Sequence, residues 1–165
     1  MEDYKAYQKT EAIQYPSYID IDLNNLEHNY QHVKNLVGQV HVMPIVKANA
    51  YGHGMIKCAK QLEKCGVHSL GVAILQEGIA LRQAGICIPI VVLGGILHCQ
   101  IDQFLHYDLA INAASIDKLL AIEQRAKELQ KRAHVHLEID TGIEFTQAFN
   151  TVTFNSLPSY RGAYP

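Results

Sequence analysis

Lys47 stands where a strand-like segment gives way to a turn, and its amine is the group best placed to do chemistry. An apolar run covers residues 42–46, two glycines follow within residues 51–54, and residues 55–65 form an amphipathic segment. This order predicts a strand, a tight turn and a helix. Ligands of parallel α/β barrels bind at the carboxyl ends of strands. A neutral lysine amine in such a place forms a Schiff base with a carbonyl compound.

The residues after Lys47 suit the binding of a phosphate. Tyr51, four positions on, carries a hydroxyl that can reach the same ligand, and a helix N-terminus favours a phosphate group. Gly52 and Gly54 let the backbone turn tightly and approach a ligand. A lysine at a strand end is also commonly a solvated charge, because lysines are mostly exposed. The residue types alone leave both interpretations open.

Apolar runs and amphipathic segments alternate along the chain with short connections. This alternation predicts βαβ units and a parallel sheet. At 165 residues the chain is too short for a complete (β/α)8 barrel of about 250 residues. Predicted strands cover residues 42–46, 69–73, 88–93, 109–112 and 134–139, and predicted helices begin near residues 23, 55, 75, 99 and 115. Asp22 and Ser115 are expected to cap the first and the last of these helices, which should end at Gly38 and near Arg132.

The string Val-Lys-Ala-Asn-Ala-Tyr-Gly-His-Gly at residues 46–54 closely resembles the pyridoxal 5′-phosphate (PLP) signature of alanine racemases. The resemblance extends from about Tyr18 to Gly142, through residues 18–30, 71–78, 81–86 and 139–142. It implies an α/β fold that is a partial TIM barrel, with about five of the eight strands. We therefore expect the N-terminal barrel portion of a fold type III enzyme, truncated after the fifth strand.

The resemblance also implies roles for individual residues. Lys47 would hold PLP as the internal aldimine and act as an acid/base on one face of the substrate. Tyr51 would contact the cofactor phosphate. Leu75 would line the cofactor ring, although ordinary barrel core is nearly as good an interpretation. Glu138 stands where the family often carries a modified lysine, and Phe145 stands where an arginine is expected.

The implied activity is interconversion of L- and D-alanine, an isomerase reaction that supplies D-alanine for cell wall synthesis. In this family the base for the opposite face is a tyrosine from the C-terminal domain of the partner subunit of a homodimer. We therefore expect weak or no activity from the chain alone. Three alternatives stay open: a single-domain PLP-binding protein without turnover, a product that binds no cofactor, and a substrate other than alanine, such as serine.

Composition argues against nucleic-acid and membrane partners. The formal net charge is −2 with 18% charged residues, which offers no basic surface to a polyanion. The first twenty residues lack the apolar core of a signal peptide, and no apolar run approaches the ~20 residues of a membrane span. His134 and His136 alternate on one strand without a third ligand at zinc-like spacing. We predict a cytoplasmic chain without a metal site.

The chain divides into three parts by composition. Residues 1–17 form a polar leader, residues 18–142 form the barrel portion, and residues 143–165 form a divergent tail without helix or strand periodicity. We expect the tail to lack regular structure. Its departure from the family pattern suggests a truncated or frame-disrupted copy of a longer gene.

Overall fold

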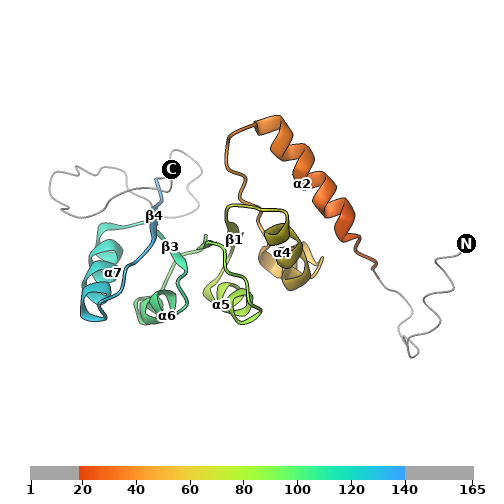
Figure 1. The fold of residues 1–165 in the computed structure, drawn as a ribbon. Helices are drawn as coiled ribbons and strands as arrows, with labels where there is room; N and C mark the ends of the chain where they lie inside the picture. The colour runs from red at the N-terminus through yellow and green to blue at the C-terminus, as the bar shows by residue number, and fades with distance from the viewer. Residues whose placement is uncertain (1–18, 140–165) are drawn as a thin grey trace, which may run out of the picture.

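The computed structural model describes residues 19–139, which are arranged as Figure 1 shows. The predicted leader and tail lie outside the described residues. No helix among residues 19–139 combines the length and apolar character needed to cross a bilayer.

Helix α2 (Leu23–Val37) comes first, with both ends as predicted. The Asp22 carboxylate accepts hydrogen bonds from the N–H groups of Asn24 (2.8 Å) and Asn25 (3.3 Å), which caps the helix. The helix ends at Gly38, whose φ of +62° suits glycine. Helix α2 packs against the next long helix, α4 (Met55–Lys64).

Four parallel strands form one sheet in chain order, which confirms the predicted α/β class. Each strand pairs with its neighbours in sequence, for example Leu70 with Ile90 and Asn112 with His136. The strands are β1 (Leu70–Val72), β2 (Ile90–Val92), β3 (Ala110–Ala113) and β4 (Val135–Leu137).

The predicted strand at residues 42–46 is wrong in extent, because only Ile45 pairs with β1, through an isolated bridge to Gly71. The Gly71 N–H donates to Pro44 O, and the Val46 N–H donates to Gly71 O. Towards the N-terminus the ladder would need an N–H from Pro44, which has none. Towards the C-terminus the next ladder acceptor would be Val46 O, but this oxygen accepts the Ala50 N–H of the turn that carries Lys47.

Figure 1 shows helices α4 to α7 along one face of the sheet. Alternate strand residues point into this layer, and they are buried: Leu70, Val72, Ile90, Val92, Ile111 and Ala113. The residues between them, such as Gly71 and Asn112, face the other way. We call that second side the inner face. The helices after α4 are α5 (Leu75–Gln83), η2 (His98–Gln100, a 3₁₀ turn), α6 (Ile101–His106) and α7 (Ile116–Glu128).

Candidate functional site

The turn that carries Lys47 is left-handed. Element α3 (Lys47–Tyr51) follows the bridge to β1, and four successive residues, 48–51, have φ between 50° and 56°. L-residues pay about 1–2 kcal/mol each for this conformation, so four in a row must be held by their surroundings. The sequence predicted a turn here but not its hand.

Backbone and side-chain hydrogen bonds hold the turn. The Ala50 N–H donates to Val46 O over 2.9 Å. The Asn49 side-chain oxygen accepts the Met55 N–H at 2.9 Å and so links the turn to the first residue of α4. His53 Nδ1 lies 2.9 Å from Ala50 O. The residues of the glycine-containing loop therefore hold one another in place.

Glu77, on the first turn of α5, ties the lysine turn to the end of β1. Its Oε1 accepts the Ala48 N–H at 2.7 Å, and its Oε2 accepts the Ala73 N–H at 2.8 Å. Sequence reasoning missed this residue. The pattern around residue 77 indicated a helix start, but no local signal reports a contact made 29 positions away.

Lys47 and Tyr51 lie on the same turn at the carboxyl edge of the sheet. Lys47 is half-buried. Within residues 19–139 its amine has no hydrogen-bond or ion-pair partner. The Tyr51 side chain is 60% exposed. Both groups are therefore accessible to a ligand.

Leu75 occupies a different environment from these two residues. It is 2% exposed and belongs to the core between the sheet and the helices. This burial favours the interpretation as ordinary barrel core, and a cofactor-lining role for Leu75 stays a prediction that its position does not support.

Apolar side chains that do line the inner face gather around Gly71. A Cβ at Gly71 would lie 2.5 Å from Ile45 Cδ1, 3.4 Å from Leu93 Cδ1 and 3.7 Å from Met43 Cε. Leu93, directly after β2, is half-buried and shares the carboxyl edge with Lys47. Strand alternation places Leu93 on the same side of the sheet as Val91 and Gly71, a signal that is present in the sequence but that gave no candidate there.

A polar pair lies at the carboxyl ends of β3 and β4. Asn112 donates one side-chain hydrogen bond to Leu93 O (2.9 Å) and another to Glu138 Oε2 (2.7 Å). The half-buried Glu138 carboxylate is thus held in place on the inner face, whereas Phe145 lies outside the described residues.

A cavity beside the turn lies on the α2 side rather than over Lys47. Its volume is about 740 Å³, and Tyr30, Val46 and Tyr51 are among its lining residues, whereas Lys47 is not. The described residues bring together no group of three or more His, Cys, Asp or Glu side chains that would hold a metal ion. Ala50 and Tyr51 belong both to this cavity and to the lysine turn.

Comparisons with known proteins point to one family. The family described as alanine racemase, N-terminal domain, matches residues 21–144. The alanine racemase of Carboxydothermus hydrogenoformans is 41% identical over 128 residues, which are 78% of this chain and 35% of that protein. The alanine racemase of Halothermothrix orenii is 40% identical over 129 residues, again 78% of this chain and 34% of its own length.

Solved structures agree in fold. An alanine racemase of Clostridium difficile 630 in complex with cycloserine matches with a TM-score of 0.80 and 35% identity, over 84% of this chain and 38% of that one. An alanine racemase from Oenococcus oeni matches with a TM-score of 0.70 and 34% identity, over 76% and 36% of the two chains. The chain thus spans about a third of the length of the curated relatives it matches. It has the partial α/β barrel of these proteins and belongs to the family of alanine racemase N-terminal domains.

Proposed function

We propose that the chain is the N-terminal barrel portion of a PLP-dependent alanine racemase, in which Lys47 carries the cofactor. The observation that carries the proposal is the Lys47 amine, which is half-buried at the carboxyl edge of the sheet and has no partner among residues 19–139. The relatives named alanine racemase support alanine as the substrate. We further propose that residues 18–142 form the barrel portion and that the complete enzyme is a homodimer.

The donor set on the turn fits PLP. When bound, PLP supplies an electrophilic carbonyl and a ring that delocalises negative charge from the substrate α-carbon. Lys47 supplies a primary amine, and Tyr51 supplies an exposed hydroxyl that can donate to a phosphate oxygen. Because both residues belong to one hydrogen-bonded turn, their relative positions are set before any ligand arrives. The apolar side chains of Ile45 and Leu93 lie on the inner face below this edge.

Racemisation needs proton transfer on both faces of the α-carbon. In this proposal the Lys47 Nζ holds and returns the proton on one face. The second acid/base comes from the two thirds of the longer relatives that this chain does not match. Loss of a positioned acid/base costs about 10²- to 10⁴-fold in rate. The chain alone is therefore expected to bind PLP but to racemise alanine poorly.

A labelling experiment tests the proposal. The 165-residue chain is incubated with PLP and reduced with borohydride, and its peptides are examined by mass spectrometry. We expect a pyridoxyl group on Lys47 at substoichiometric PLP, and none there in Lys47→Ala. Lys57→Ala is the matched control, because Lys57 is an exposed lysine on α4. Equal labelling of many exposed lysines, with no preference for Lys47, would contradict the proposal.

A further inference from the structure

The Glu77 carboxylate stands where the parallel ladder between residues 45 and 71 would have continued. One more step of that ladder would pair the Ala73 N–H with Val46 O and the Ala48 N–H with Ala73 O. Both acceptors are taken, because Val46 O accepts from Ala50 and Ala73 O accepts from Gly94. Glu77 accepts both displaced N–H groups, one on each carboxylate oxygen. The sheet therefore ends in a carboxylate clamp between the two chain segments.

We propose that Glu77 is a positioning residue for Lys47: its carboxylate holds the left-handed lysine turn against the end of β1. The inference rests on the proposed function of Lys47. The clamped N–H belongs to Ala48, the residue directly after Lys47, and on the other side the Val46 N–H is bonded to Gly71 O at 2.8 Å. The backbone of Lys47 is thus fixed on both sides, which limits the positions that its amine can reach.

Helix capping alone does not account for this arrangement. A glutamate on the first turn of a helix commonly accepts the N–H of the N-cap residue, and Glu77 does so weakly, with the Ile74 N–H at 3.3 Å. The bonds to Ala48 and Ala73 are shorter, at 2.7 Å and 2.8 Å. The shortest bond joins α5 to a strained turn rather than to its own helix.

Glu77→Gln is the informative variant. A glutamine keeps the size of the side chain but has one acceptor oxygen, so its NH₂ group must face one of the two N–H donors. Glu63 provides a matched control elsewhere in the fold. Its Oε1 accepts the N–H groups of Cys87 (2.7 Å) and Ile88 (3.1 Å), which ties α4 to the segment before β2. Glu63→Ala removes a carboxylate that accepts a comparable pair of backbone N–H groups away from Lys47.

The first measurement is native-state amide hydrogen exchange of the full chain without added cofactor, with NMR as the method of detection. We expect Glu77→Gln to speed exchange at Ala48, Ala73 or both by about tenfold or more, as loss of a charge-assisted hydrogen bond implies. Glu63→Ala should instead speed exchange at Cys87 and Ile88. Unchanged exchange at Ala48 and Ala73 in Glu77→Gln would overturn the proposal, whether or not the chain binds PLP.

The second measurement is a PLP titration with borohydride trapping and peptide mapping. We expect Glu77→Gln to need about tenfold more PLP for half-labelling of Lys47, and Glu63→Ala to need the same amount as the wild type. Thermal unfolding of both variants shows whether their losses of stability match. An equal loss of labelling in the two variants would overturn a positioning role. If wild-type Lys47 takes no label, the proposed function fails, and the exchange data alone decide whether Glu77 holds the turn.

Discussion

Asn49 has two structural tasks in the lysine turn. Its side-chain oxygen accepts the Met55 N–H at the start of α4, and its backbone has a φ of +56°. Asparagine visits the left-handed region more readily than other residues with a Cβ. The neighbouring Ala48 and Ala50 share the conformation without that tolerance. The type of residue at position 49 therefore affects both the strain of the turn and the capping of the helix.

We predict that substitutions at Asn49 separate these two contributions. Asn49→Ala loses the cap and adds strain, so it should lower the free energy of unfolding by about 2 kcal/mol. Asn49→Gly loses the same cap but adopts φ +56° without penalty, so its loss should be about 1 kcal/mol or less. Asn49→Asp keeps an acceptor and should stay close to the wild type. Urea unfolding measures all three, and equal losses for the alanine and glycine variants would show that strain contributes nothing.

Among the site residues, the sequence predicted those that belong to a contiguous local pattern and missed those that depend on distant contacts. Lys47 and Tyr51 were found as candidates because the string around them is contiguous, and the structure places both on one turn. Glu77 was missed because its partner Ala48 lies 29 positions away. Leu75 was predicted to line the cofactor ring, with ordinary barrel core as the alternative, and it lies in the core, whereas Leu93 lies with the inner-face side chains. The binding roles themselves stay predictions.

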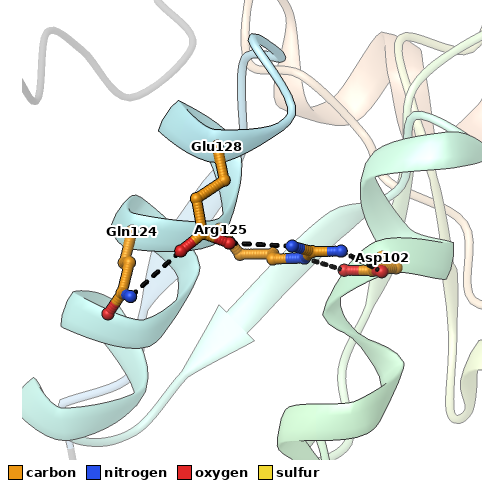
Figure 2. Close-up of polar contacts among 4 residues, drawn as sticks. All are labelled: Asp102, Gln124, Arg125 and Glu128. Atoms are coloured by element: carbon orange, nitrogen blue, oxygen red, sulfur yellow. Dashed lines mark hydrogen bonds and ion pairs between the residues drawn. The ribbon is translucent and has the colours of Figure 1, made fainter.

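At the element scale, an ion-pair network joins α6 and α7, as Figure 2 shows. Arg125 Nη2 donates to Asp102 Oδ2 at 2.7 Å, and Arg125 Nη1 donates to Glu128 Oε2 at 2.7 Å. Gln124 donates to the other oxygen of Glu128. Hydrogen bonds from Arg125 lower the pKa of Asp102, and those from Arg125 and then Gln124 lower the pKa of Glu128. The network links two helices that cover neighbouring strands.

We predict that the stability contributed by this network decreases as the pH falls. A carboxyl group whose pKa is lower in the folded state stabilises it above the ordinary pKa, and that contribution is lost as the pH falls through the lowered value. Asp102→Asn should therefore be slightly less stable than the wild type at pH 7. The difference should shrink as the pH falls below about 4, the ordinary value for aspartate. Urea midpoints across this range measure it.

High salt at pH 7 should also shrink the difference, because both partners are exposed and screened. The double variant Asp102→Asn/Arg125→Gln is the control. Arg125→Gln should lower the free energy of unfolding less in the Asp102→Asn background than in the wild type. A difference that is the same at pH 3 and pH 7 would mean that Asp102 acts through helix propensity rather than through its charge.

The elements themselves were largely predictable, and the exceptions have local causes. Asp22, Gly38 and Ser115 mark helix ends as expected, with the Ser115 hydroxyl accepting the Lys118 N–H at 3.4 Å. Helix α7 ends at Glu128 rather than near residue 132, because the chain turns at Gln130, whose φ is +52°. The strand at residues 42–46 shortened to a bridge because Pro44 lacks an N–H and Glu77 competes for the ladder partners. The spacing of hydrophobic residues along the sequence predicts neither effect.

At the scale of the whole molecule, the described residues form one side of a barrel. Helices α4 to α7 cover the outer face, and Ile45 and β4 lie at the two ends of the strand order. Helix α2 packs on α4 and keeps apolar side chains exposed near its end, with Leu36 at 74% and Val33 at 43%. Contiguous exposed apolar side chains commonly mark surfaces that pack against another element or chain. The matched residues cover only about a third of the length of the curated relatives that share this fold.

A chimera tests whether this chain can supply one half of a catalytic site. We predict that residues 1–142 of this chain, joined to the unmatched remainder of the Carboxydothermus hydrogenoformans racemase, racemise alanine at least about 10²-fold faster than the 165-residue chain alone. The reason is that the remainder supplies the second acid/base and pairs the strand edges, whereas Lys47 and its clamped turn already lie at the carboxyl edge. Conversion of L-alanine to D-alanine with added PLP is the measurement.

Lys47→Ala in the chimera should abolish this activity, and Lys57→Ala should leave it unchanged, because Lys57 lies on the exposed side of α4. A chimera that folds, as judged by its thermal unfolding, but does not racemise alanine would show that this chain's own residues are deficient. Equal rates for the isolated chain and the chimera would instead mean that the added part of the relative contributes no acid/base. Only the combination of a fast chimera, a slow isolated chain and dependence on Lys47 assigns one half of the proton transfer to this chain.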